Sequence, residues 1–561
     1  MIEITHRWGL AKKGRWKFRG SEIQLPNVFF LKGKRFNPLK DADVTISKDE
    51  KSTFMIYDSF FETTNRGKAV PSTFGYPEEL EGKLIESRGG CKKIQVLFDQ
   101  ELDHNAELYI LGNAPQLLNR SKKIVERLVG IRKKIPFHKL IYAPGIAQPQ
   151  NIALLTYLGV DLFDSASAEY FSQKNVELSD WIGFQKESPE NNRKLLDELK
   201  LIRKAIETNK IRELVETRVR SEPWMVEGLR HIDKEYELVS NTVPVTGDKI
   251  LVTTYEGLNR PDIERFRRRI KERYTPPKRD LLLLLPCSAS KPYFQSRSHF
   301  YFRNALRDTN WTNIHEVILT SPLGVVPREI EQFYPAKQYD IPVTHEWTEE
   351  EKSMIFSQLQ YILKKGAYKH IVSHLPSDLS FVSGSIDCID TTNGTHPTDH
   401  KSLNNLSRVV IEKIGITKGD VQKFLKENML SLAQFQFGKA GKRLLEGTKI
   451  KGRYPEYKII SKEDNTQRGM LVSERGLISL TLEGAEILQK EKINIAEIDD
   501  FIPKGSIFAV GVKRADSKIH PEDEVIVVHD KELRGVGPAS MSGKEMTEAN
   551  KGEAIRIRHY H

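Results

Sequence analysis

The stretch that decides the fold of this chain reads Leu281-Leu282-Leu283-Leu284-Leu285-Pro286-Cys287-Ser288-Ala289-Ser290-Lys291. An unbroken apolar run between Asp280 and Pro286 is typical of a strand that is buried on both faces of a sheet. In open α/β sheets, ligands bind just beyond the carboxyl ends of the strands. The sequence therefore predicts that the polar residues after Leu285 form a functional site.

Reactive side chains crowd the segment that follows this strand. Lys291 comes shortly after Cys287, and a nearby cation stabilises a thiolate. An isolated cysteine is more often a small buried residue than a nucleophile. The phenol and imidazole close by favour a catalytic site instead, and the predicted catalytic residues are Cys287, Lys291, Tyr293 and His299.

Length and charge limit what the protein can be. At 561 residues, and at about one domain per 150 residues, the chain should form three or four domains. Lys and Arg total 87 against 76 acidic residues, and the net charge of +11 favours a polyanionic partner. Three cysteines are too few for a disulfide scaffold, and no apolar run is long enough to span a bilayer. We expect a cytoplasmic protein with no membrane partner.

The first predicted domain, 1–277, alternates short apolar strands with amphipathic helices. This alternation indicates parallel β/α units, and the length suits a TIM-like (β/α) barrel with active residues at strand ends. Asp164 directly follows the predicted strand 160–163. It is a candidate substrate-binding carboxylate, although from its position alone a helix N-cap is the better-supported role.

The end of this domain is strongly basic between 260 and 279, and Pro276-Pro277 marks the predicted boundary. Charged helix faces are often only solvated. The excess of one sign favours phosphate contact instead, and the predicted RNA-binding residues here are Arg265, Arg268 and Arg269.

Three further domains are predicted, so that the fold class is multidomain α/β. Segment 278–405 is a second, smaller α/β domain, with strands at 281–285, 314–320 and 370–374 and an amphipathic helix at 349–364. Segment 406–490 is an α+β spacer. Segment 491–561 has short β runs at 506–512, 524–528, 533–536 and 554–557, separated by Gly, Pro and Asp, which is typical of a small barrel-like module. Lys513 and Arg514 are its predicted RNA-binding residues, and plain solvation is the alternative explanation for their charge.

The loop after the leucine strand fits the pattern P-C-x-x-x-K-P-Y-x-x-S-x-x-H in full. The residues that fill it are Pro286, Cys287, Lys291, Pro292, Tyr293, Ser296 and His299. This pattern resembles the signature of archaeosine synthases, which are paralogues of the tRNA-guanine transglycosylases. Segment 143–167 is similar to the archaeal transglycosylase barrel, and 508–552 resembles a PUA domain, a module that binds structured RNA. The resemblance extends over essentially the whole chain.

Two departures from the transglycosylase pattern count against base exchange. In that family the aspartate that maps to Asp164 attacks ribose C1′. The family's zinc site is missing, because Cys91 and Cys287 are far apart and neither has a paired cysteine. The element that orders the base stands here as Asp58-Ser59-Phe60, and Phe60 in place of glycine would prevent close backbone approach. We expect neither a metal nor a cofactor.

The resemblance implies a tRNA substrate that carries 7-cyano-7-deazaguanine in its D-loop, and free lysine as the nitrogen donor to the nitrile. It places the turn 321–329 and Tyr339-Asp340 beside the signature loop, so that Glu329 and Asp340 would hold the donor's ammonium. The predicted substrate-binding residues are Ser290, Ser296, Ser321, Glu329, Asp340 and Asp164.

Thiolates attack nitriles readily, so Cys287 is predicted to form a thioimidate. Lys291 would keep the thiol ionised, and His299 or Tyr293 would move protons. Direct attack by the amine, with Cys287 only lining the pocket, stays open.

A radical-SAM partner enzyme that cleaves the adduct is carried over from the family, and a homodimer stays open. Two other functions remain as alternatives. One is base exchange through Asp164. The other is a non-catalytic tRNA-binding scaffold, which would bind tRNA in a salt-sensitive way without modifying it.

Overall fold

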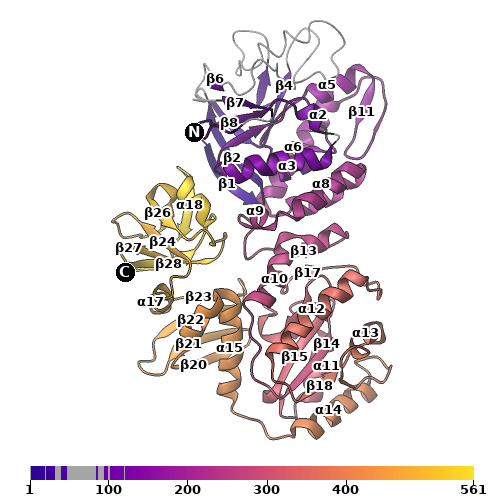
Figure 1. The fold of residues 1–561 in the computed structure, drawn as a ribbon, viewed down its shortest axis with the longest axis vertical. Coiled ribbons are helices and arrows are strands. Elements are labelled where there is room, and N and C mark those ends of the chain that lie inside the picture. The colour runs from indigo at the N-terminus through magenta and orange to yellow at the C-terminus, as the bar shows by residue number, and fades with distance from the viewer. Residues whose placement is uncertain are drawn as a thin grey trace. The chain divides into compact units, whose positions relative to one another are not determined.

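The computed structural model describes residues 2–18, 21–31, 39–46, 84–85, 94–98, 101–118 and 120–561. These residues form two compact units (Figure 1). Unit 1 comprises 1–243, 508–512 and 541–554, and unit 2 comprises 244–507, 513–540 and 555–561. Cys91 and the Asp58-Ser59-Phe60 element lie outside the described residues.

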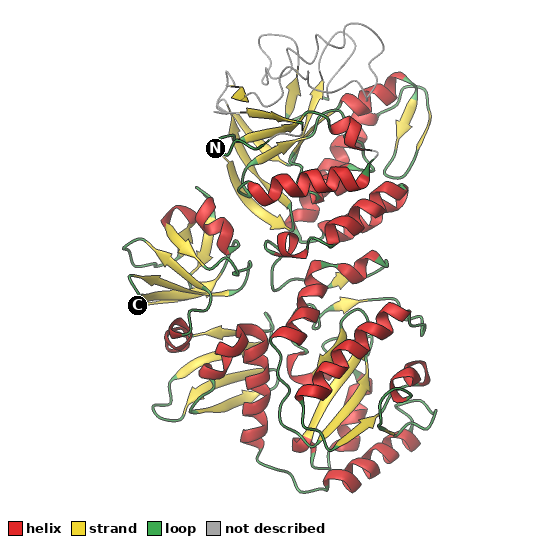
Figure 2. Ribbon diagram, in the orientation of Figure 1, coloured by secondary structure: helices red, strands yellow, loops and turns green. Residues whose placement is uncertain are grey.

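Unit 1 contains a small antiparallel sheet and a larger, mostly parallel one (Figure 2). The small sheet has the order β1 (Ile2–Trp8), β2 (Ala11–Phe18), β3 (Ser21–Leu25). The large sheet has the order β5 (Val44–Ile46), β4 (Asn27–Leu31), β10 (Leu162–Asp164), β9 (Leu140–Tyr142), β8 (Leu108–Leu111), β7 (Ile94–Leu97), β6 (Leu84–Ile85). Its pairs are parallel except β6 with β7. Parallel β/α units are thus present, while no pairing of β5 with β6 closes a barrel among the described strands.

Helices of unit 1 bury apolar faces in one large core. In α3 (Ser121–Lys134), Ile124, Leu128 and Ile131 face this core at helical spacing, and the basic last turn complements the helix dipole. Other helices among its described residues are α2 (Ala114–Leu118), α4 (Ile152–Tyr157), α5 (Ala166–Gln173), α6 (Asn191–Glu207), α7 (Ile211–Arg218), α8 (Pro223–Asp233) and α9 (Tyr236–Ser240). A hairpin of β11 (Val176–Leu178) and β12 (Gly183–Gln185) follows α5.

The leucine run forms β14 (Leu281–Pro286), the central strand of a five-stranded sheet in unit 2. Its five leucines are 0% exposed, which confirms the prediction of a strand buried on both faces. Two parallel strands flank it, β15 (Ile314–Thr320) and β18 (His370–Ser373). The edges are β16 (Gly324–Pro327), antiparallel to β15, and β19 (Ile389–Asp390), parallel to β18. The carboxyl ends of β14, β15 and β18 therefore meet at one edge.

Helices around this sheet are α11 (Arg297–Leu306), α12 (Glu349–Lys365), α13 (Ser380–Ser383) and α14 (His400–Ile414). Unit 2 starts at Pro244, so that it includes residues on both sides of the predicted domain boundary near 277. It does so because α10 (Pro261–Glu272), which precedes that boundary, packs Phe266 against Phe435 of α15 (Val421–Phe437), at 5.2 Å between ring centroids. A short parallel pair, β13 (Ile250–Leu251) with β17 (Tyr339–Asp340), also ties the start of unit 2 to the sheet domain.

The predicted spacer is an antiparallel sheet in the order β20 (Thr448–Arg453), β21 (Glu456–Ser461), β22 (Gln467–Val472), β23 (Leu477–Leu480). It is accompanied by α15, α16 (Gly441–Leu444) and α17 (Leu482–Lys490). The C-terminal segment adds a sheet in the order β26 (Val512–Ala515), β24 (Ile495–Ile498), β27 (Glu524–His529), β28 (Glu532–Pro538), β30 (His559–Tyr560). Its other elements are β25 (Ser506–Phe508), α18 (Gly543–Glu548) and β29 (Glu553–Arg556).

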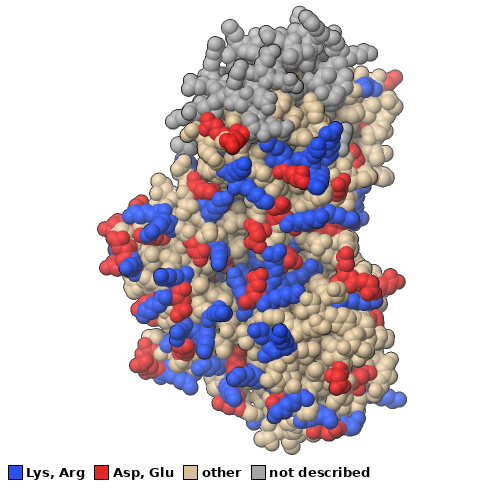
Figure 3. All heavy atoms as spheres, viewed as in Figure 1, with Lys and Arg blue, Asp and Glu red and all other residues tan. Residues whose placement is uncertain are grey.

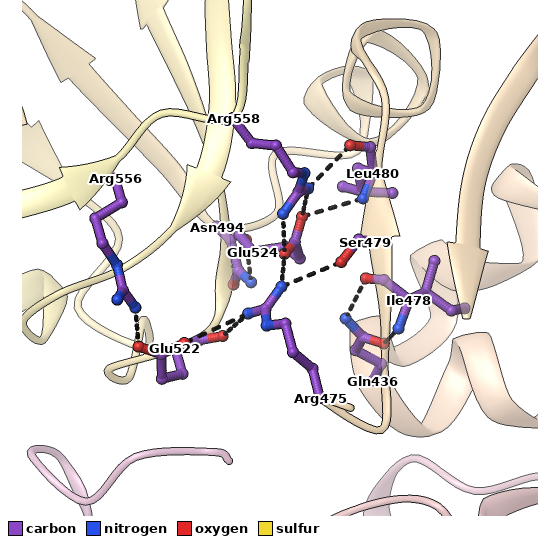
Figure 4. A network of polar contacts seen from close by, with 10 residues as sticks. All are labelled: Gln436, Arg475, Ile478, Ser479, Leu480, Asn494, Glu522, Glu524, Arg556 and Arg558. Atoms are coloured by element: carbon purple, nitrogen blue, oxygen red, sulfur yellow. Dashed lines mark hydrogen bonds and ion pairs between the residues drawn. The ribbon is translucent and has the colours of Figure 1, made fainter. Parts of the chain in front are cut away.

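A buried carboxylate joins the spacer to the C-terminal sheet. Glu524 of β27 accepts hydrogen bonds from the guanidinium groups of Arg475 and Arg558 and from the backbone N–H of Leu480 in β23 (Figure 4). Its side chain is 0% exposed. Close by, the Gln436 amide bonds both the N–H and the carbonyl of Ile478, which anchors α15 to the same strand. In the part of the chain that the structure describes, no helix has the length and apolarity needed to cross a membrane.

Candidate active site

A cavity of about 490 Å³ lies where the carboxyl ends of β14, β15 and β18 meet. Each strand end contributes to its wall: Cys287 follows β14, Ser321 follows β15, and Asp378 lies after β18. The volume is within the range of small-molecule sites. The thiol of Cys287 is partly buried and borders this cavity, as a role in catalysis requires.

The pKa of the Cys287 thiol is higher than the sequence suggested. Burial raises its pKa, and this effect outweighs the Lys291 ammonium and a hydrogen bond with the Thr320 hydroxyl, which both lower it. The negative charge of Asp378 raises the pKa further. The expectation that Lys291 keeps the thiol ionised is therefore corrected, because desolvation is the larger effect.

Lys291 lies against the face of Tyr339, with its ammonium 4.0 Å from the ring centroid. Such a cation–π contact compensates in part for lost hydration. Burial lowers the pKa of Lys291, while the charges of Cys287 and Asp340 oppose this shift. Lys291 thus lies close enough to the Cys287 thiol for each group to shift the pKa of the other.

A chain of hydroxyl groups lies behind the thiol. The Tyr293 and Tyr339 hydroxyls are 2.6 Å apart, and the Tyr339 hydroxyl is also hydrogen-bonded to Thr320. Burial raises the pKa of both tyrosines, so they stay neutral. Sequence reasoning did not select Thr320, and it placed Tyr339 beside the signature loop without giving it a role. Their positions in the sequence could have indicated both residues. Thr320 is the last residue of the predicted strand 314–320, and Tyr339 directly precedes the selected residue Asp340.

His299 is buried and locked in a single tautomer. Its Nε2 donates to the Pro286 carbonyl oxygen at 3.1 Å, because a carbonyl can only accept. Its Nδ1 accepts from the Arg328 guanidinium at 2.6 Å. Burial and the charge of Arg328 lower the pKa of His299 well below its usual value. Both ring nitrogens are thus occupied, and the predicted proton-moving role does not fit. His299 instead fixes the backbone just before Cys287.

Two of the selected serines do not line the cavity. Ser296 is the N-cap of α11, and its Oγ accepts from the His299 N–H at 3.3 Å. Ser290 is exposed. Ser321, in contrast, lines the cavity, and its buried Oγ has no hydrogen-bond partner among the described residues.

The two carboxylates selected for the donor's ammonium already have partners. Glu329 is buried, accepts from the Tyr274 hydroxyl and lies 3.6 Å from Nε2 of His315. Burial raises its pKa, but His315 and Tyr274 outweigh this, so the pKa is lowered. Asp340 is exposed and bonds Lys249 at 2.6 Å, which lowers its pKa. Neither residue contributes to the cavity wall.

Asp164, in unit 1, is 0% exposed at the end of β10. Its carboxylate accepts from the Tyr142 hydroxyl at 2.7 Å and from the N–H groups of Gly145 and Ala166, each at 2.9 Å. Burial raises its pKa. Because Ala166 is the first residue of α5, the carboxylate contacts a helix N-terminus, but the N-cap residue of α5 is Ser165 and not Asp164.

The predicted RNA-binding residues differ in accessibility. Arg265 and Arg269 are 5% and 6% exposed, and Arg265 donates to the Pro244 carbonyl, so neither is a surface group. Arg268 pairs with Glu264 and Arg514 with Glu497, and Lys513 lies 3.4 Å from Asp499. On the face shown in Figure 3, basic and acidic side chains are interspersed. Several basic residues of the run 260–279 are thus buried and make their contacts within unit 2.

Comparison with known proteins agrees with this architecture. Residues 263–410 match a family described as a domain of unknown function (DUF5591), and residues 496–561 match the PUA domain. The archaeosine synthase subunit alpha of Methanosarcina acetivorans is 35% identical over 89% of this chain and 85% of its own length. The archaeosine synthase of Haloferax volcanii is 31% identical over 83% and 84%.

A more distant likeness links the chain to base-exchange enzymes. The tRNA-guanine(15) transglycosylase of Methanosphaera stadtmanae is 24% identical over 96% of this chain and 81% of its own length. Of these three relatives, the two archaeosine synthases are more than 30% identical to this chain over most of both lengths, and the transglycosylase is not. The chain belongs to the archaeosine synthase family, with a PUA domain at its C-terminus.

Proposed function

We propose that this chain is a tRNA-modifying enzyme of archaeosine biosynthesis, and that it adds the amine of free lysine to the nitrile of 7-cyano-7-deazaguanine in the tRNA D-loop. The observation that carries the proposal is the position of the Cys287 thiol, which borders a cavity at the carboxyl edge of three parallel strands. The curated relatives named archaeosine synthase support the pathway.

The protonated state of the thiol suits the first step. When a thiol adds to a nitrile, the sulfur bonds to carbon and the nitrogen takes one proton, which gives a thioimidate. Because the pKa of Cys287 is raised, the resting thiol carries the proton that this nitrogen needs. The Lys291 cation and the Thr320 hydroxyl would stabilise the negative charge that develops on sulfur.

The second step replaces sulfur by nitrogen. The neutral amine of the donor attacks the thioimidate carbon, the carbon–sulfur bond breaks, and the sulfur recovers a proton from the attacking amine. The product is a substituted amidine and the thiol is regenerated, so that no oxidant or reductant is needed. In this scheme a radical-SAM partner enzyme then cleaves the adduct. The PUA domain would hold the tRNA, and the enzyme would act in the cytoplasm.

Base exchange is not proposed as a second activity. The Asp164 carboxylate would have to reach ribose C1′, but it is fully buried and engaged by one hydroxyl and two backbone N–H groups. A nucleophile needs a free approach to its substrate.

The test is a lysine-dependent mass change in tRNA that already carries the nitrile base. Wild-type protein should form the adduct, and Cys287→Ala should lower the rate at least about a thousandfold if the thiol is the nucleophile. Ser288→Ala is the matched control in the same loop. Adduct formation by Cys287→Ala near the wild-type rate would leave direct attack as the mechanism. Tight tRNA binding without any mass change would leave only the scaffold function.

A further inference from the structure

The charged residues that line the cavity are of one sign. Glu346, Glu351 and Asp378 contribute to its wall, and no Lys or Arg is among the lining residues that the structure describes. A low-dielectric cleft with charge of one sign concentrates ligands of the opposite sign. This cavity therefore favours a cation and disfavours the phosphates of an RNA backbone.

Of these carboxylates, Asp378 is oriented by a hydrogen bond from a neighbouring side chain that lines the same cavity. Its Oδ2 accepts from the indole N–H of Trp347 at 3.1 Å, and its side chain is 19% exposed. His345 lies 3.6 Å from the same oxygen. The other oxygen, Oδ1, has no hydrogen-bond partner among the described residues. The indole thus orients the carboxylate and leaves one oxygen for a ligand.

The other two acids are less suited. Glu351 closes a capping box at the start of α12, where it accepts from the N–H and the hydroxyl of Thr348, each at 2.9 Å. Glu346 belongs to an exposed loop. A carboxylate already used as a cap, or one solvated at the rim, binds a cation weakly.

The remaining wall suits an alkyl chain. Ile341, Trp347, Leu379 and Phe302 line the same cavity, and the buried Ser321 hydroxyl offers a polar group without a partner. Asp378 lies close enough to Cys287 to raise the pKa of its thiol. A ligand held by Asp378 therefore lies within reach of the reaction centre.

We propose that Asp378, oriented by Trp347, is the ammonium-binding subsite of this cavity. A carboxylate keeps a bound amine protonated, and a protonated amine is no nucleophile. The ammonium on Asp378 is therefore the anchor, and a second, neutral amine attacks the carbon bound to Cys287. The attack by the second amine rests on the proposed function, whereas the ammonium subsite at Asp378 does not. Lysine has the two amines that this arrangement requires.

The experiment measures alkylation of Cys287 by iodoacetamide in the full chain without tRNA, followed by mass spectrometry of the Cys287 peptide. Lysine and 1-aminopentane should each slow alkylation of the wild-type protein in a saturable way. In Asp378→Asn the concentration needed for half-protection should rise at least about tenfold. Asp387→Asn, an exposed acid outside the cavity wall, is the matched control and should behave as wild type.

A second measurement separates this inference from the proposed function. In the tRNA assay, Asp378→Asn should raise KM for lysine far more than it lowers kcat, and 1-aminopentane should inhibit without being incorporated. Unchanged protection and unchanged KM in Asp378→Asn would overturn the subsite, as would incorporation of 1-aminopentane at the lysine rate. Saturable protection in a wild-type protein that never modifies tRNA would uphold the subsite and reject the proposed function.

Discussion

The ammonium of Lys291 lies 4.0 Å from the centroid of the Tyr339 ring, and this pair connects the two sides of the candidate site. On one side, the Lys291 charge acts on the Cys287 thiol. On the other, the Tyr339 hydroxyl joins Tyr293 and Thr320. The ring thus supports the cation and also belongs to the hydroxyl chain behind the nucleophile.

Lys291→Met should raise the pKa of Cys287 further. The cation now lowers that pKa against the larger effect of burial, and its loss leaves burial and Asp378 unopposed. The pH profile of Cys287 alkylation should therefore move to higher pH. Lys249→Met, at an exposed pair with Asp340, is the control and should move the profile far less. A shift of the Lys291→Met profile to lower pH would contradict this account.

Asp378→Asn should move the same profile in the opposite direction. The Asp378 carboxylate disfavours a second negative charge on the nearby sulfur, so its neutralisation lowers the pKa of Cys287. At a fixed pH below that pKa, alkylation should be faster in the variant than in the wild-type protein. Stopped-flow or quenched alkylation at several pH values measures the difference. Slower alkylation across the whole range would show that Asp378 instead maintains the shape of the cavity.

His299→Asn should lower the free energy of unfolding. The pH profile of the reaction rate should keep the same number of titrating groups. Loss of the bonds to Pro286 and Arg328 should cost about 1–3 kcal/mol of unfolding free energy. The pKa of His299 is depressed in the folded state, so its contribution is present above the unfolded value of about 6.5 and is lost as pH falls below it. The gap between wild type and variant in urea unfolding should narrow from pH 7.5 to pH 5.5. A rate profile that loses a limb near neutral pH would restore His299 as a proton carrier.

Glu524→Gln should weaken the attachment of the C-terminal sheet to the spacer. The change removes the charge that lies between Arg475 and Arg558, so two cations face each other around a neutral group (Figure 4). Removal of one partner from a buried ion network costs about 3 kcal/mol, seen as a lower melting temperature or earlier proteolysis near residue 490. Glu532→Gln, an exposed partner of Arg534, should change stability by less than about 1 kcal/mol. Equal effects of the two variants would refute the structural role of Glu524.

Much of the sheet domain was predictable because its signals are local. The leucine run, the strand 314–320 and the helix beginning at Glu349 appear in the structure where periodicity placed them. The run 506–512 was predicted as one strand and is interrupted by a turn of helix at Ala509–Gly511, since such a short apolar run does not reveal a break in its hydrogen bonding.

The sequence by itself determined the reactive loop: a buried strand must end at Pro286, and a thiol and an amine follow at once. Only the tertiary structure decided which carboxylate shares a cavity with that thiol. Glu329 and Asp340 looked suitable in the sequence, yet their charges are used by His315 and Lys249. Asp378 lies far along the chain and reaches the site because β18 pairs in parallel with β14. Strand pairing between distant segments sets such neighbours, and no local pattern of residue types encodes it.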